Sequence, residues 1–135
     1  MTQKVYTMGY GGQKLPLVQK AMDQLGAVIF DIRYSPRSRN PTWNGANLRR
    51  VLGARYRHVK AFGNRNYKGG PVEIVDYEAG KKAVEQCGRP VILMCVCRDY
   101  QRCHRRNIAE QLRADGFEVE ELDPSAPAIT QQRLF

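Results

Sequence analysis

The stretch from Arg89 to Leu112 constrains the fold most strongly, because it predicts a strand, a loop and a helix in direct succession. Val91 to Cys97 is a short apolar run that follows a proline, and such a run is typical of a strand buried on both faces. After a polar loop, Ile108 and Leu112 recur at helical spacing. In open α/β sheets, ligands bind beyond the carboxyl ends of the strands, where helix N-termini present free N–H groups. We therefore expect a functional site where this strand meets this helix.

The same alternation of strands and helices continues along the rest of the chain. We expect further strands at residues 4–8, 27–33, 56–61 and 117–122, and further helices at 15–25, 47–52 and 77–87. This order predicts a mainly parallel sheet of about five strands with helices on both faces. The last strand alternates polar and apolar residues, which is typical of an edge strand. The predicted organisation is a single three-layer α/β domain over residues 1–122, followed by a tail over 123–135.

The charge of the chain is strongly positive and concentrated in its middle. The formal net charge is +9, and residues 33–68 contain ten Arg or Lys residues and no Asp or Glu. Aromatic residues lie between these cations, namely Tyr34, Trp43, Tyr56, Phe62 and Tyr67. Such a run favours a groove that binds phosphates and stacks bases, although a solvated basic face with the aromatic residues in the core is the alternative. We therefore expect a nucleotide or nucleic acid as partner rather than a membrane.

Two groups of polar side chains are candidates for contacting that partner, one after the second strand and one after the buried central strand. The side chains expected to contact phosphate or nucleic acid are Arg33, Arg37, Arg39, Asn44, Asn64, Arg102 and Arg105.

Three residues are candidates for catalysis. Asp31 lies inside an apolar strand, where a carboxylate is costly unless it is paired or hydrogen-bonded. It is either a structural partner of an arginine such as Arg33 or a carboxylate with a perturbed pKa at the strand end. Cys103 lies near a predicted helix N-terminus beside His104 and several arginines, a setting that lowers a thiol pKa and creates a thiolate. Asp31, Cys103 and His104 are therefore the catalytic hypothesis.

The four cysteines lie in one short stretch, at positions 87, 95, 97 and 103, and do not resemble a secreted disulfide framework. A zinc site at Cys95, Cys97, Cys103 and His104 is an alternative, but the spacing matches no usual zinc motif, and we expect no metal cofactor. The cysteines could also be inert core residues. No apolar run approaches the roughly 20 residues of a membrane span, and the N-terminus lacks an apolar leader. We therefore expect a cytoplasmic protein.

The tail contains a short peptide with a separate predicted role. Residues 123–128 form a Pro-containing linker, which is expected to be extended. Gln131, Leu134 and Phe135 follow it, and this Gln-x-x-Leu-Phe pattern resembles the peptide that bacterial DNA-processing proteins use to dock on the sliding clamp. The alternative is that Leu134 and Phe135 fold back onto the domain as a hydrophobic latch.

Four segments, in order along the domain, carry a resemblance to a known family. They are Thr7-Met8-Gly9-Tyr10, the segment from Asp31 to Ser38 with Asn40-Pro41, Phe62-Gly63-Asn64, and the block from Leu93 to Arg105. Together they resemble the bacterial and archaeal "domain of unknown function 488" family; the tail lies outside the match, and Cys97 and a compact middle region depart from the pattern. The resemblance implies an α/β fold and a shared pocket, and it carries no known activity.

The functional hypothesis that follows is a DNA-associated protein that binds nucleotide or nucleic-acid phosphates in a basic pocket at the strand ends. Hydrolysis or processing of damaged DNA, as in repair, would be the enzymatic form of this hypothesis. The alternatives are a thiol-dependent enzyme acting on small phosphorylated or sulfur-containing substrates, and a nucleic-acid-binding module without catalysis.

Overall fold

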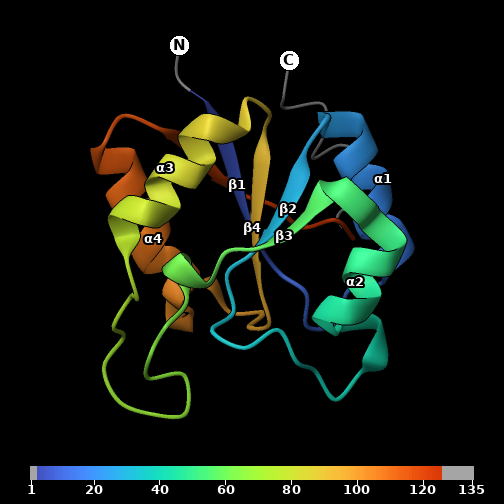
Figure 1. The fold of residues 1–135 in the computed structure, drawn as a ribbon, viewed down its shortest axis with the longest axis horizontal. Helices are drawn as coiled ribbons and strands as arrows, with labels where there is room; N and C mark the ends of the chain where they lie inside the picture. The colour runs from blue at the N-terminus through green and yellow to red at the C-terminus, as the bar shows by residue number, and fades with distance from the viewer. Residues whose placement is uncertain (1–2, 126–135) are drawn as a thin grey trace.

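A computed structural model of the chain describes residues 3–125, in which a five-stranded sheet lies between two layers of helices (Figure 1). The strand order is β3-β2-β4-β1-β5, and every neighbouring pair is parallel. The strands are β1 Lys4–Gly9, β2 Val28–Asp31, β3 Tyr56–His58, β4 Val91–Cys95 and β5 Glu118–Glu121. The predicted α/β class with a mainly parallel sheet is confirmed, and β5 lies at the expected edge.

Helices cover both faces of this sheet (Figure 1). The helices α1 Leu15–Leu25 and α2 Gly45–Leu52 lie on one side, and α3 Tyr77–Cys87 and α4 His104–Ala114 lie on the other. Single 3₁₀ turns occupy η1 Pro41–Trp43, η2 Gly53–Arg55, η3 Lys60–Phe62 and η4 Tyr100–Arg102.

Successive residues of the central strands enter two separate cores, because side chains alternate across a sheet. Ile29 and Ile92 pack in the core that contains residues of α1 and α2, whereas Phe30 and Leu93 pack in the core that contains residues of α3 and α4. All five residues of β4 are buried, as expected of a central strand covered on both sides. The sheet is therefore a rigid support for the loops that follow its strands.

Among the predicted strands that end earlier than the sequence suggested, the one expected over 27–33 ends at Asp31, and two others change the loops near the strand ends. The strand expected over 56–61 ends at His58 and continues into the 3₁₀ turn η3. The strand expected over 91–97 ends at Cys95, so Val96 and Cys97 lie in the loop and are exposed. The early end of β4 places the Cys97 side chain at the carboxyl edge of the sheet.

Among residues 3–125, no helix has both the length and the apolar character needed to cross a membrane. Most of the predicted tail, including Gln131, Leu134 and Phe135, lies outside the described residues.

Candidate anion-binding site

A cavity of about 790 Å³ opens at the carboxyl ends of the strands. Loops after β1, β2 and β4, the N-terminus of α4, and the loop over residues 64–72 line it. Within residues 3–125 its charged lining residues are Arg33, Arg37, Arg39, Lys68 and Arg102, with the titratable His104 beside them, and no Asp or Glu of these residues lines it. The volume lies in the range of small-molecule sites, so the cavity is large enough for a nucleotide.

Asp31 neutralises Arg33 at the inner wall of the cavity. Two guanidinium nitrogens of Arg33 donate to the carboxylate, from Nε to Oδ1 at 2.8 Å and from Nη2 to Oδ2 at 2.5 Å. The hydroxyl of Tyr56 donates to the same carboxylate at 2.6 Å, and burial together with this carboxylate raises the pKa of Tyr56. Asp31 is fully buried and does not line the cavity. Of the two alternatives for Asp31, the structure supports the structural partner, and a catalytic role in direct contact with a ligand is not supported.

The remaining part of the Arg33 guanidinium faces the cavity wall formed by Tyr10. Nη1 of Arg33 donates to the Tyr10 hydroxyl at 3.1 Å, and the Tyr10 ring stacks on Trp43 with centroids 4.7 Å apart. His58 Nε2 lies 2.7 Å from the carbonyl oxygen of Arg33 and fixes the backbone there. Arg33 is therefore held rigidly, with only 6% of its surface exposed, at the edge of the cavity.

The long cationic side chains at the rim of the cavity have fewer partners within the protein than Arg33 has. Arg37, Arg39 and Lys68 are exposed, and within residues 3–125 none of them has a carboxylate within ion-pair distance. Arg102 is also exposed and lies 3.5 Å from the carboxylate of Asp99. The expected positions of Arg37, Arg39 and Arg102 at one pocket are thus found, and among the described residues no carboxylate pairs with Arg37 or Arg39.

Asn44 has a different role from the one predicted. Its side-chain oxygen accepts a hydrogen bond from the backbone N–H of Ser38 at 2.6 Å, and it is not among the lining residues of the cavity. Asn44 therefore shapes the loop that carries Arg37 and Arg39, and the expectation that it contacts nucleic acid directly is corrected.

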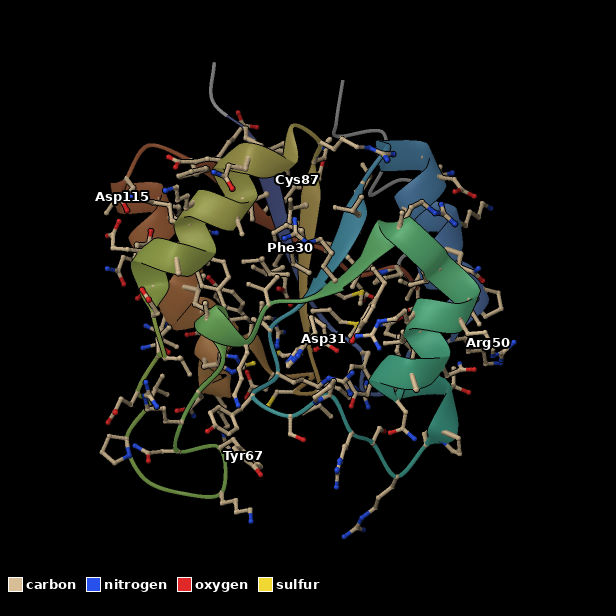
Figure 2. The ribbon with its side chains drawn as sticks, in the orientation of Figure 1. Phe30, Asp31, Arg50, Tyr67, Cys87 and Asp115 are labelled. Carbon is tan, nitrogen blue, oxygen red and sulfur yellow. The ribbon has the colours of Figure 1, made fainter. Side chains whose placement is uncertain are left out.

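Asn64 and Tyr67 come from the loop on the opposite side of the opening. The Asn64 side-chain oxygen accepts from the backbone N–H groups of Asn66 and Glu73, at 3.0 and 2.9 Å, so it holds the loop closed at its base. Tyr67 is 53% exposed and stacks on Tyr34 with centroids 5.5 Å apart. Figure 2 shows Asp31 in the interior near the strand ends and Tyr67 on the outer loop at the same end of the molecule.

Arg105 was predicted to contact phosphate, but its side chain is completely buried. Its Nε and Nη2 donate to the two carboxylate oxygens of Glu121, at 3.1 and 2.7 Å. Nη1 donates to the carbonyl oxygen of Cys97 at 2.6 Å, and Nη2 also donates to that of Arg98 at 3.2 Å. Arg105 does not line the cavity; it ties the loop after β4 to the edge strand β5, and the predicted phosphate contact is corrected.

The end of β1 also packs closely against the loop after β4 that Arg105 holds. A Cβ atom at Gly9 would lie 1.7 Å from the carbonyl oxygen of Cys97, so only glycine lets the end of β1 approach the loop after β4 so closely. The opening motif around Gly9 and Tyr10 therefore serves the geometry of the site.

Three thiols meet beneath the cavity, and only one of them is exposed. Cys95 and Cys103 are buried, whereas Cys97 is exposed and lines the cavity. Hydrogen bonds from the thiols of Cys103 and Cys95 lower the pKa of Cys97, and the positive charge of Arg105 acts in the same direction. Burial raises the pKa of Cys95. The predicted nucleophile Cys103 is thus a buried neighbour, and Cys97 is the thiol that a ligand can reach.

His104 lines the cavity at the first residue of α4. Its Nε2 lies 2.8 Å from the carbonyl oxygen of Ile32 and must therefore carry the proton, which leaves Nδ1 as an acceptor 3.9 Å from the sulfur of Cys103. Burial lowers the pKa of His104, so the ring is neutral near pH 7.

Although Cys95, Cys97, Cys103 and His104 come together, the described residues contain no group of three or more His, Cys, Asp or Glu side chains arranged to hold a metal ion. No protein-family model, curated protein or solved structure matches the chain. The chemistry of the site therefore has to be argued from its own residues.

Several lining residues were missed at the level of sequence. Tyr10, Ser35, Ser38 and Asn66 line the cavity. Tyr10, Ser35 and Ser38 lie in the segments that carry the family resemblance, which is the signal that could have identified them, whereas Asn66 has no such signal. Cys97 was assigned to the strand because the apolar run continues through Val96, and no residue before Arg98 marks the end of the strand.

Proposed function

We propose that the chain binds the phosphate groups of a nucleotide or nucleic acid in the strand-end cavity. The observation that carries this proposal is the lining: among the residues that the structure describes, five cationic side chains and no carboxylate surround a space of about 790 Å³. Arginine and lysine side chains make charge-assisted hydrogen bonds with phosphate oxygens, and a wall without acids avoids repulsion of the ligand.

Tyr67 supports a nucleotide or a nucleic acid over inorganic phosphate. Its ring is half exposed at the cavity, is backed by Tyr34, and Tyr34 in turn lies under the ammonium group of Lys60 at 4.4 Å. A supported aromatic face next to cations is the arrangement on which unpaired bases stack. The proposed partner is therefore a single strand or a nucleotide with an accessible base.

Binding of a short labelled single-stranded oligonucleotide, followed by fluorescence anisotropy at several salt concentrations, tests this proposal. In single strands, each phosphate neutralised contributes roughly 0.7 to the slope of log affinity against log salt. We expect Arg37→Ala together with Arg39→Ala to reduce that slope by about 1.4 and to weaken binding at every sequence.

Arg89→Ala is the matched control, because Arg89 is exposed but precedes β4 and therefore lies at the other end of the sheet. Equal losses from Arg89→Ala and from the cavity variants would mean that overall charge, and not this cavity, binds the oligonucleotide. Tyr67→Ala should weaken binding of the oligonucleotide by about 1–3 kcal/mol, and it should leave binding of inorganic phosphate unchanged.

Docking on the sliding clamp remains a separate proposal that concerns only the sequence of the tail. A linked peptide would raise the concentration of the domain near DNA without any new contact to DNA. Deletion of residues 131–135 should abolish binding to the purified clamp and leave the melting temperature of the domain unchanged. A large drop in melting temperature would favour the latch.

A thiol-dependent enzyme is the second candidate function, and the position of Cys97 favours it. Cys97 is an exposed thiol with a lowered pKa inside a cationic cavity, which are the conditions for a nucleophile acting on an anionic substrate. In this alternative Cys97, and not Cys103, attacks the substrate. Substrate turnover that survives Cys103→Ser but not Cys97→Ser would support it.

A further inference from the structure

The thiols of Cys95, Cys97 and Cys103 lie at the cavity and differ in solvent exposure: that of Cys97 is exposed, and the other two are buried. Cys97 and Cys95 both border the cavity, but Cys95 and Cys103 are only 1% and 3% exposed. Both buried thiols are hydrogen-bonding neighbours of Cys97. The Cys97 backbone is held in place, because its carbonyl oxygen accepts from Arg105 at 2.6 Å. A reactive sulfur with a second sulfur already beside it is the arrangement that forms disulfides.

We propose that Cys97 is a nucleophilic thiolate that small hydroperoxides oxidise, and that Cys103 then captures the oxidised sulfur in an intramolecular disulfide. This proposal does not rest on nucleotide binding, because its chemistry involves only the thiols. We name small hydroperoxides as the oxidants because they are uncharged and small enough to enter the cavity. The cationic side chains that line the cavity therefore do not hinder their approach to Cys97.

The negative charge belongs on Cys97 for a physical reason. Of the three sulfurs only Cys97 is exposed to water, and an anion is more stable where it is solvated. The groups that face this sulfur favour the anion: the thiols of Cys103 and Cys95 donate to it, and the guanidinium of Arg105 lies nearby. His104 is the remaining titratable neighbour, and it is neutral near pH 7.

The first step is attack of the Cys97 sulfur on the terminal oxygen of the hydroperoxide. The O–O bond breaks, the alkoxide leaves and takes a proton from water, and Cys97 becomes a sulfenic acid. In the second step the sulfur of Cys103 attacks the sulfur of Cys97, and hydroxide leaves and takes up the proton released by Cys103. In total, two thiols and one hydroperoxide give one disulfide, one alcohol and one water.

Cys103 is better placed than Cys95 for this second step. Cys103 is the N-cap of α4, directly before His104. Nδ1 of His104, 3.9 Å from the same sulfur, can accept the proton that Cys103 loses. The pKa values of Cys95 and Cys103 are both raised, so the nearby imidazole, and not a lower pKa, favours Cys103.

Alkylation of the full chain by iodoacetamide tests the thiolate without any mutation. The four cysteines are followed separately by mass spectrometry of the digested protein. We expect Cys97 to react at a nearly constant rate between about pH 5.5 and 8, because it stays ionised over this range.

Cys87 is the internal control, since it lies at the end of α3 and at the other end of the molecule from Asp31 and Tyr67 (Figure 2). The alkylation rate of any thiol rises about tenfold for each pH unit as long as the pH is below the pKa of that thiol. If the rate at Cys97 rises with pH as steeply as the rate at Cys87, the thiolate assignment is wrong.

Oxidation with a small excess of hydrogen peroxide, followed by blocking of free thiols and a non-reducing digest, tests the pairing. The intact chain and the Cys87→Ser and Cys95→Ser variants should form the Cys97–Cys103 disulfide, which dithiothreitol reverses. Cys103→Ser should form no disulfide and should instead carry a sulfenic acid at Cys97 that dimedone traps.

Two results would overturn the proposal. One is oxidation of Cys97→Ser at the rate of the unmodified chain, and the other is a Cys95–Cys97 disulfide as the main product of the unmodified chain. Cys97 is exposed, so replacing it with serine removes little packing, and circular dichroism of each variant verifies that it folds.

Discussion

Two arginines that look alike in the sequence have opposite roles at the two sides of the site. Arg33 and Arg105 both follow a central strand, and each binds a carboxylate through two guanidinium nitrogens. The partner of Arg33 is Asp31, which is fully buried, whereas the partner of Arg105 is Glu121, whose side chain is 37% exposed. The difference lies in where the fold places each guanidinium.

Arg33 directs Nη1 at the cavity wall, where it donates to the hydroxyl of Tyr10 and, at 3.4 Å, to the carbonyl oxygen of Arg37. Arg105 lies behind the wall, and its nitrogens also donate to the sulfur of Cys95 and to the carbonyl oxygens of Cys97 and Arg98. Arg33 therefore belongs to the wall of the cavity, and Arg105 belongs to the support of the loop that carries Cys97. Both guanidinium groups have internal partners, so what separates the two arginines is whether the fold places the side chain at the cavity surface.

The largest expected effect comes from breaking the Asp31–Arg33 pair. Asp31→Asn keeps the size of the side chain but leaves the buried guanidinium of Arg33 without a counter-charge. We expect a loss of roughly 3–5 kcal/mol in the free energy of unfolding, measured by urea denaturation. Tyr56→Phe, which removes only one donor to the same carboxylate, is the control and should cost about 1.5–3 kcal/mol. An Asp31→Asn protein as stable as the Tyr56→Phe protein would contradict the role assigned to this pair.

The equivalent change on the other side should cost less. Glu121→Gln removes the counter-charge of Arg105, but water reaches the exposed part of Glu121 and can solvate the change. We expect a loss of about 1–2 kcal/mol in the free energy of unfolding, together with slower alkylation of Cys97, because the loop after β4 is less firmly held. If Glu121→Gln costs as much as Asp31→Asn, the contrast between the two pairs fails.

The framework of the fold could be predicted from local patterns, and the reason is visible in particular elements. Helix α1 ends at Leu25 as predicted, because Gly26 adopts a left-handed conformation with φ of 64°. Helix α3 begins at Tyr77, where the side chain of Asp76 caps it by accepting from the N–H of Ala79. Such signals lie within a few residues of the boundary that they set, so one sequence is enough to identify them.

The roles of individual site residues depended on contacts far apart in the sequence. The sequence correctly indicated that Arg33, Arg37, Arg39 and Arg102 converge on one pocket, because all follow strands whose carboxyl ends share an edge. It could not show that the carboxylate of Glu121, 16 residues after Arg105, accepts hydrogen bonds from the Arg105 guanidinium. Nor could it show that β4 ends two residues early and exposes Cys97 instead of Cys103, because the apolar run continues through Val96.

The smallest expected effect concerns His104, which lies between Arg33 and Arg105. It precedes Arg105 in the chain, and its Nε2 lies 2.8 Å from the carbonyl oxygen of Ile32, the residue before Arg33. Burial lowers the pKa of His104 in the folded state, whereas the unfolded chain binds a proton below about pH 6.5. The unfolded state therefore binds more protons below that pH, and the stability present above it is lost as the pH falls. Per pH unit this loss is at most about 1.4 kcal/mol.

His104→Gln tests this contribution, because the glutamine amide can donate to the same carbonyl oxygen of Ile32 but does not titrate. Urea denaturation of both proteins between about pH 5 and 8 should show a smaller loss of stability on acidification for the glutamine variant. Groups that both proteins share, including the carboxylates, cancel in this difference. Parallel curves would mean that His104 has the same pKa in the folded and unfolded states, and that burial does not lower it.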